Sequence, residues 1–455
     1  MTTQHPPGIE FTWGDIFRLA ISGQKFDPLA FSLQISDEYG GFVRNKFGFI
    51  EIYQIADPEL AHAVLVERAN EFHKGAIMKR AFGPFVGNGL LTSEGDFWKR
   101  QRRLAQPAFH HRRIISYADT MVQHADAMLN TWRDGASLDI DREMMKVTLG
   151  IVNKTLFNAD VSAVASRVGE LMTDVLDAAN ENLNAIVALP ASVPTPRRLR
   201  QKRKIAELDA IIQGFVDERR RTQEDTGDLL SMLLQAQDDD GSGMTDRQLR
   251  DEVMTLFLAG HETTANALTF ALYLLAENPQ AKATLQQEVD SALQGRLPGL
   301  NDLNAMPFTE QVIKETLRLY PAAPAVARSP YHDLQLGGYT VRKDATMQVS
   351  MWAMHRSSRY WQQPSAFMPE RFSPENEKAI LRYAYLPFGA GPRVCIGNQF
   401  AMMEARLLLA AIVSRFDFAM APGAVVEVEQ LMTLRPRGGV RMVLRQREQA
   451  RHPVS

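Results

Sequence analysis

Apolar residues recur at the spacing of an α-helix along most of this 455-residue chain. One long stretch of this kind begins after Thr245, and Gln248 three residues later completes the signature of a capping box. The pattern predicts a helix to about Asn278, which at ~1.5 Å per residue would span about 50 Å. A second helix is predicted over 398–414, with apolar positions at Phe400, Met403, Leu407, Leu408 and Ile412.

Two more helices are predicted over about 166–188 and 201–224, because the helical pattern is broken between them by Pro190, Pro194 and Pro196. The stretches 42–55 and 334–350 alternate between apolar and polar residues instead, which predicts strands. The first stops at Asp57-Pro58, and the second contains turn signals at Gly337-Gly338 and Lys343-Asp344. No repeat or linker divides the chain. We therefore expect one domain, residues 1–455, that is mainly α with a small β-region.

Composition narrows the class of protein. The chain is 45% hydrophobic with a formal net charge of −2, which is ordinary for a soluble protein and argues against nucleic acid as its main partner. No apolar run approaches the ~20 residues that cross a bilayer. The first 25 residues are interrupted by prolines and charges, so we expect neither a signal peptide nor a membrane anchor. A single cysteine without a signal peptide fits a reducing cytoplasm.

Cys395 is that single cysteine, so the chain can form neither an intramolecular disulfide nor a four-cysteine zinc site. A buried structural thiol, a nucleophile and a single-thiolate metal ligand remain possible. Gly389, Gly391 and Gly397 around it allow tight turns and a close approach to another group, which favours the ligand. The following helix start and Arg393 both favour the thiolate form, which iron binds as an electron-rich axial ligand.

The long predicted helix contains Ala259-Gly260-His261-Glu262-Thr263-Thr264. Its two small residues would let a flat cofactor or oxygen approach the backbone, and a carboxylate beside a hydroxyl can relay protons. The alternative is a plain helix interior in which the threonine bonds back to the carbonyl four residues earlier. A zinc protease is excluded because its His-Glu-x-x-His motif needs a histidine where Ala265 stands.

Two further pairs lie at helical spacing. Trp98 and Arg102 are one turn apart, so an indole N–H and a guanidinium could face the same acidic ligand, although a solvated basic surface has the same appearance. Glu315 and Arg318 form an i,i+3 pair, which by itself is a common surface feature. The segment Pro369-Glu370-Arg371-Phe372 follows them along the chain.

Together, and in this order, these motifs resemble the cytochrome P-450 haem-thiolate enzymes, whose haem loop is matched by Phe-x-x-Gly-x-Arg-x-Cys-x-Gly at 388–397. The resemblance covers about 40–445 and implies the triangular P-450 fold with a long central oxygen-binding helix. It implies haem b with Cys395 as axial iron ligand and Phe388 packed on the thiolate loop. Thr263 would hold dioxygen, Glu262 would supply protons, and Ala259 and Gly260 would face the haem.

The resemblance also assigns roles to other side chains. It implies that Trp98, Arg102, Arg328 and Arg393 contact the haem propionates. Glu315, Arg318 and Arg371 would form a buried structural network behind the cysteine loop, since unpaired buried charges are costly. The residues expected to line the substrate pocket are Leu90, Leu91, Phe257, Ala323, Val326 and Met432.

The expected function is a monooxygenase that inserts one oxygen atom into a hydrophobic substrate, with a long-chain fatty acid as the first choice and a terpenoid or other secondary metabolite next. The chain has no Gly-x-Gly-x-x-Gly fingerprint, so its electrons would come from a separate ferredoxin or flavodoxin and its reductase. The basic clusters 99–103 and 110–113 could dock such an acidic partner or simply be solvated surface.

Three alternative functions follow from the same residues. A peroxide-driven peroxygenase on this scaffold would replace the acid–alcohol pair by Arg-Pro, so Glu262 and Thr263 count against it. A haem-based gas sensor without catalysis is disfavoured by the same proton relay. A cysteine hydrolase would need a histidine base near Cys395, and the chain has none between His355 and His452.

Overall fold

The computed structural model describes residues 5–448, except positions 13, 16–25, 49, 223–226, 239–240 and most of 159–194. The chain forms two compact units, each built from three separate segments. The β-rich unit comprises Met1–Gly75, Lys314–Cys395 and Val428–Arg435; the helical unit comprises Ala76–Ile313, Ile396–Glu427 and Pro436–Ser455. Because neither unit is one continuous stretch, they are not successive domains along the chain. The expectation of a single domain stays a prediction.

The β-rich unit is organised around a six-stranded sheet of order β1-β2-β3-β9-β6-β4. Its strands are β1 (Glu10–Phe11), β2 (Phe42–Phe47), β3 (Ile50–Ile55), β9 (Thr346–Ser350), β6 (Ala325–Pro330) and β4 (Phe72–His73). The predicted strand region 42–55 is confirmed as the antiparallel pair β2–β3. It ends where Asp57 caps helix α3 (Pro58–His62) by accepting hydrogen bonds from the backbone N–H groups of Glu59 and Leu60, both at 3.0 Å.

The predicted strand region 334–350 is also confirmed. It forms β7 (Leu334–Leu336), β8 (Tyr339–Val341) and β9, with β7 and β8 paired antiparallel. Gly337 and Gly338 make the turn between them at φ angles of 57° and 83°, which glycine adopts without steric cost. The chain order is non-local, since β9 runs parallel to β3 and antiparallel to β6.

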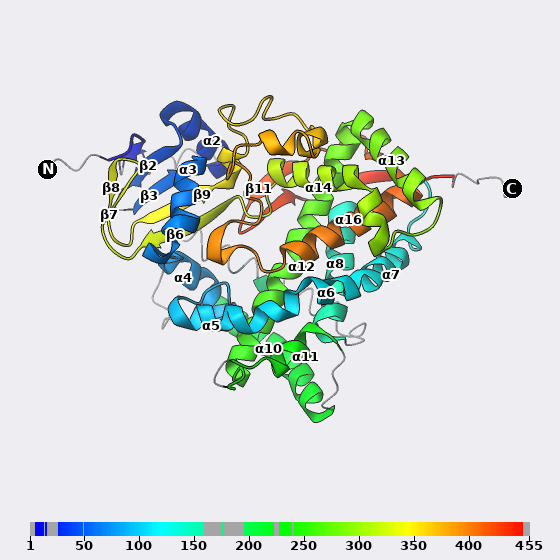
Figure 1. Cartoon of the computed structure of the whole chain (residues 1–455), viewed down its shortest axis with the longest axis horizontal. Helices are drawn as coiled ribbons and strands as arrows, with labels where there is room; N and C mark the ends of the chain where they lie inside the picture. Colours follow the sequence, from blue (N-terminus) through cyan, green and yellow to red (C-terminus); the bar gives the residue numbers. More distant parts are fainter. Residues whose placement is uncertain are drawn as a thin grey trace. The chain divides into compact units, whose positions relative to one another are not determined.

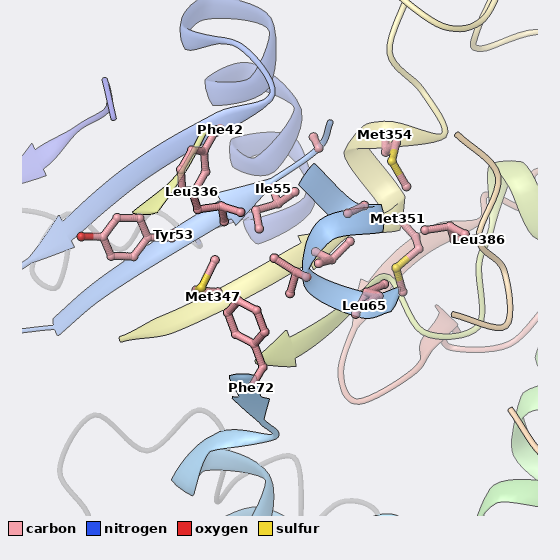
Figure 2. Packing of buried hydrophobic residues seen from close by; sticks show 14 of the residues in the cluster. Phe42, Tyr53, Ile55, Leu65, Phe72, Leu336, Met347, Met351, Met354 and Leu386 are labelled. Carbon is pink, nitrogen blue, oxygen red and sulfur yellow. The ribbon is translucent and has the colours of Figure 1, made fainter. Parts of the chain in front are cut away.

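A hydrophobic cluster packs around the sheet of the β-rich unit (Figure 2). Side chains from the sheet, such as Tyr53 and Met347, meet others from α3 and from the short helix α15 (Met351–Met354). Leu65 and Leu386 belong to the same cluster. The remaining elements of this unit are α2 (Pro28–Tyr39), the turns η1 (Ala63–Glu67), η2 (Ala69–Glu71), η6 (Pro369–Phe372), η7 (Glu377–Ala379) and η8 (Gly391–Arg393), and the pair β11 (Glu427–Gln430) and β12 (Leu434–Arg437).

The helical unit contains the two helices that the sequence predicts most strongly. Helix α12 (Asp246–Glu277) begins with the expected capping box of Thr245 and Gln248 (Figure 1). Helix α16 (Asn398–Arg415) follows the cysteine loop in the chain and packs against α12. Nearly every residue of α12 between Leu249 and Leu275 is buried, because helices cover it on several sides.

Helix α8 packs along α12 in this unit, and α10, α11 and α13 also contact α12. The other elements are α4 (Gly75–Val86), α5 (Gly95–Ala105), η3 (Gln106–Phe109), α6 (His111–Ile114), η4 (Ile115–Tyr117), α7 (Ala118–Leu129), α8 (Ile140–Phe157), α10 (Pro196–Thr222), α11 (Leu229–Gln235), α13 (Pro279–Leu293) and η5 (Leu300–Ala305). Helix α14 (Pro307–Leu319) runs from one unit into the other along the chain. The predicted helix 201–224 is confirmed as α10, while 166–188 lies almost entirely outside the described residues.

A small antiparallel sheet of the helical unit was not predicted. It joins β10 (Phe416–Met420), β13 (Arg441–Gln446) and β5 (Ser137–Asp139), whose register pairs Phe418 with Leu444 and Leu138 with Met442. Among the helices that the structure describes, none has the length and apolar character needed to cross a bilayer.

Candidate functional site

The loop that carries Cys395 is fixed within the β-rich unit. The Cys395 N–H donates a hydrogen bond to the Phe388 carbonyl at 3.0 Å and closes the loop. Gly391 has a φ of +69°, and a Cβ on it would stand only 1.9 Å from the Leu65 carbonyl oxygen. Only glycine therefore lets the loop lie against η1. The loop leaves the Cys395 side chain exposed.

Glu315, Arg318 and Arg371 come together in the β-rich unit, as the resemblance implies. Arg318 donates two hydrogen bonds to the Glu315 carboxylate, at 2.7 and 2.8 Å, and both side chains are completely buried. The Arg371 Nε donates to the same carboxylate at 3.3 Å, and the backbone N–H of Met368 donates to it at 2.9 Å. Each buried charge is thus paired and hydrogen bonded, which is the condition for tolerating it.

His355 links this network to the segment before the cysteine loop. Its carbonyl accepts a hydrogen bond from Arg318 at 2.8 Å, and its ring Nε2 accepts the Leu386 N–H at 2.9 Å. Burial, together with the nearby charges of Arg318 and Arg356, lowers the pKa of His355 to about 3. The ring is therefore neutral and serves as an acceptor that anchors the chain two residues before Phe388.

The other predicted residues of the β-rich unit lie on separate elements. Arg328 is on β6, with its Nη1 donating to the Ala327 carbonyl at 2.8 Å, and Arg393 ends η8. Ala323 and Val326 pack half-buried against the hydrophobic cluster. Phe388 and Met432 are also half-buried.

The middle of α12 has an opening in its otherwise buried surface. Between Leu249 and Leu275 the residues that are not buried are Ala259, Gly260, Thr263 and Tyr273. Ala259 and Thr263 are four apart and share one face of the helix. The Thr263 hydroxyl donates to the Ala259 carbonyl at 2.8 Å, which is the back-bond that the plain helix interpretation also expects.

The packing of two helices explains why position 260 is a glycine. A Cβ at this position would stand 3.1 Å from Cγ2 of Val152, so the missing side chain lets α8 lie close to α12. The Thr148 hydroxyl of α8 donates to the His261 carbonyl at 3.0 Å, directly after this glycine. Of the two small residues in the motif, Ala259 is the exposed one.

The two residues that precede Thr263 are both buried. Burial lowers the pKa of His261 to about 4, and a contact of its Nδ1 with the Phe257 carbonyl at 3.3 Å offsets this in part. His261 is therefore neutral at physiological pH. Glu262 is 5% exposed, and Phe257, predicted as a pocket residue, is 1% exposed.

Trp98 and Arg102 lie together on α5, at a groove of about 770 Å³ in the helical unit. The groove is strongly basic. Its remaining lining residues are Lys99, Arg103, Gln106, Pro107, His110, Arg112 and Arg113. Two of the cations already have acidic partners, since Lys99 pairs with Asp96 at 2.9 Å and Arg103 pairs with Asp238.

Glu404 on α16 was not singled out from the sequence. It is completely buried, and neither carboxyl oxygen has a hydrogen-bond partner among the described residues. Burial raises its pKa to about 8; the Thr264 hydroxyl of α12 interacts with it short of hydrogen-bond geometry and offsets part of the shift. The sequence does contain a sign that Glu404 is buried, because it stands midway between Phe400 and Leu408 on the apolar side of the predicted helix.

The comparisons with known proteins agree with these features. The family description that matches the chain is Cytochrome P450, over residues 16–442. The chain belongs to the cytochrome P450 family. This cytochrome P450 is 36% identical to cyclooctatin synthase of Streptomyces melanosporofaciens, over 91% of each chain. It is 34% identical to pentalenene oxygenase of Streptomyces avermitilis, over 90% of each chain.

A solved structure, the haem domain of cytochrome P450DA, superposes with a TM-score of 0.90 at 25% identity over the full length of both chains. The mainly α fold with small β-sheets is therefore confirmed, and the chain is a cytochrome P450 monooxygenase, an enzyme that uses haem. Its family implies redox partners and hydrophobic substrates. The residues present suit a haem: an exposed thiol for iron, a small exposed Ala259 for a flat ring, and cations for carboxylates.

Proposed function

We propose that this cytochrome P450 hydroxylates or epoxidises a terpenoid-class substrate with one oxygen atom from dioxygen, using haem b ligated by Cys395. One observation carries the proposal. The chain's only thiol is exposed at the end of a loop that is closed by the Cys395–Phe388 hydrogen bond and packed through Gly391. A structural cysteine would instead be buried as a small apolar side chain.

The bound haem supplies the redox chemistry that activates dioxygen, which protein side chains cannot supply. The chain's own contribution on the thiolate side is to hold one sulfur in place and to control its charge. Cys395 would provide the anionic ligand, and the N-terminus of α16, which begins three residues later, favours that anion. Phe388, half-buried in the same loop, limits the access of water to the sulfur.

On the oxygen side, Thr263 and Glu262 handle protons. The Thr263 hydroxyl already donates to the Ala259 carbonyl, so its oxygen retains lone pairs that can accept a hydrogen bond. Glu262 is the buried carboxyl group next to it in sequence, which suits it to supply protons. Ala259 presents a methyl group and no polar atom, so it gives a flat ring an apolar surface.

The propionates of the haem are assigned to cations and one indole. Trp98 and Arg102 share the basic groove of the helical unit, which favours carboxylate binding there. Arg328 and Arg393 are the corresponding candidates of the β-rich unit. The buried Glu315, Arg318 and Arg371 have the structural role of holding the segments that precede the cysteine loop.

A terpenoid now ranks ahead of a long-chain fatty acid. Two of the relatives are described as a cyclooctat-9-en-7-ol 5-monooxygenase and a pentalenene oxygenase, each 34% identical to this chain. The side chains that we propose for the substrate pocket are all apolar, which suits a hydrocarbon substrate. They are Leu90, Leu91, Phe257, Ala323, Val326 and Met432.

We also propose a small acidic ferredoxin or flavodoxin as the electron donor, in the cytoplasm. The basic groove around Lys99 and Arg113 offers the complementary charge that speeds such an encounter. Charge pairing of this kind weakens as ionic strength rises.

The test has two stages. The reduced protein with carbon monoxide should show the red-shifted Soret band of a thiolate-ligated haem, and Cys395→Ser should lose it while keeping its fold by circular dichroism. A wild type without that band would refute the assignment. Turnover with a surrogate ferredoxin and reductase should then oxygenate polycyclic terpenes in preference to fatty acids. Equal turnover with peroxide alone would instead favour the peroxygenase.

A further inference from the structure

The turn at 87–94, which joins α4 to α5, is held by two adjacent carboxylates of α12. The backbone N–H of Asn88 donates to Asp251 at 2.8 Å, and the N–H of Leu90 donates to Glu252 at 2.9 Å. Asp251 and Glu252 are 3% and 1% exposed. Hydrogen bonds from backbone N–H groups to buried carboxylates are strong, because the acceptor is charged. We call Asp251 and Glu252 the carboxylate clamp.

Two glycines bring the turn into direct contact with α12. Gly87 has a φ of +56°, and a Cβ on it would stand 2.2 Å from both carboxylate oxygens of Asp251. A Cβ on Gly89 would stand 2.2 Å from the Thr255 hydroxyl. Since real Cβ atoms cannot approach so closely, any side chain at these positions must push the turn off the helix.

The turn is also stiff by itself. The Thr92 hydroxyl donates to the Gly87 carbonyl at 2.7 Å, and the Ser93 N–H donates to the Gly89 carbonyl at 2.9 Å. Leu90 and Leu91 stand at the centre of this turn, with Leu90 buried and Leu91 half-buried. The positions of these two side chains therefore follow from where the clamp holds the backbone.

The clamp extends to α10 through Arg250. The Arg250 Nη1 donates to Asp251 at 2.9 Å, and its Nε donates to Asp209 of α10 at 2.8 Å. Arg247 adds a second cation 3.3 Å from Asp251. Well-packed apolar residues would often stabilise a buried position as well as paired charges do, so the charges here point to a positional task.

We propose that Asp251 and Glu252 are positioning residues for substrate selection, because they set where Leu90 and Leu91 stand. This inference rests on the proposed function, in which both leucines line the substrate pocket. The clamp leaves the chemistry at Cys395 and Thr263 untouched. It determines which substrates fit and which carbon atom is presented.

The first measurement is hydrogen exchange of the 87–94 turn in the haem-loaded enzyme. Glu252→Leu removes the acceptor of the Leu90 N–H, and exchange there should rise about tenfold to a hundredfold. Glu252→Gln keeps an accepting oxygen and should stay near the wild type. Gly89→Ala should also raise exchange, because it displaces the turn itself and leaves the acceptors on α12 unchanged. Asp246→Asn is the matched control, since it breaks another α10–α12 ion pair, with Arg220, remote from the turn in sequence.

The second measurement combines ligand affinity, followed by the spin-state shift of the haem, with the ratio of oxygenated products. Both are normalised to the amount of correctly loaded enzyme, which the carbon monoxide band reports. Glu252→Leu and Gly89→Ala should weaken ligand affinity and change the product ratio. Glu252→Gln should keep both close to the values of the wild type. Unchanged exchange in Glu252→Leu would overturn the clamp. Raised exchange with unchanged affinity and product ratio would show a purely structural contact and overturn the inference. A wild type without the carbon monoxide band would refute the proposed function alone, since the exchange result stands without it.

Discussion

Replacing Glu404 with glutamine should stabilise the folded protein increasingly as the pH rises. In the folded chain this carboxyl group is completely buried on α16, and its pKa is raised from 4.5 to about 8. The folded state therefore holds the proton more tightly than the unfolded state does. The contribution of this group to the free energy of unfolding is fully present below pH 4.5 and is lost as the pH rises through about 8.

The size of the effect follows from the two pKa values. The interval from pH 4.5 to pH 7 is about 2.5 pH units, and at 1.36 kcal/mol for each unit the folded state loses about 3 kcal/mol of stability. The full interval to a pKa of about 8 corresponds to about 5 kcal/mol. Glutamine has nearly the same shape and does not titrate, so it avoids this loss. The advantage of Glu404→Gln over the wild type should grow by these amounts with pH.

The assay compares denaturant midpoints of the haem-loaded wild type and Glu404→Gln between about pH 5 and about pH 9. Glu277→Gln, at the exposed last residue of α12, is the matched control and should show no such trend. In parallel, the infrared spectrum of the wild type at neutral pH should contain a protonated carboxylic acid band that Glu404→Gln lacks. A pH-independent difference in midpoint, or no such band, would refute the argument that burial keeps Glu404 neutral.

Three further substitutions test the packing of the proposed site. Gly391→Ala should abolish haem retention, because its Cβ would collide with a backbone carbonyl at 1.9 Å. Gly389→Ala is the control and should lose much less haem, since its φ is also positive but nothing lies within 4 Å of its Cβ. The haem-to-protein ratio measures both variants. Glu315→Ala should lower the free energy of unfolding by about 3–5 kcal/mol, because it leaves a buried arginine unpaired, and an unchanged denaturant midpoint would contradict this. Gly260→Ala should lower the melting temperature through its 3.1 Å approach to Val152, and the double variant with Val152→Ala should recover it; failure of the rescue would assign the glycine another task.

Local signals account for the parts of the fold that could be predicted. The capping box at Thr245 marks the start of α12, and the Gly337-Gly338 turn marks the hairpin of β7 and β8. The sheet of β5, β10 and β13 was missed for a physical reason. Its strands are short, and β5 pairs with a strand some 300 residues away, as in Leu138 with Met442. Pairing of this kind leaves no local pattern.

The same difference between local and long-range signals applies to the residues of the candidate site. The motifs around Cys395 and Thr263 could be predicted because their residue types and spacings are contiguous in the chain. The carboxylate clamp could not, since Asn88 and Asp251 are 163 residues apart. Gly87 and Gly89 were not singled out from the sequence, and only the position of α12 beside them explains why no Cβ fits there.

The buried ionisable residues at the start and in the middle of α12 lie in different surroundings. In its N-terminal half, the buried carboxyl group of Asp251 is paired with Arg250 at 2.9 Å. In the middle, where Ala259 is exposed and Thr263 is half-buried, burial keeps His261 neutral on α12 and keeps Glu404 neutral on the adjoining helix. His261, the residue before Glu262, therefore adds no charge beside it at neutral pH. The role in proton delivery that we propose for Glu262 is thus not opposed by a charge on the preceding side chain.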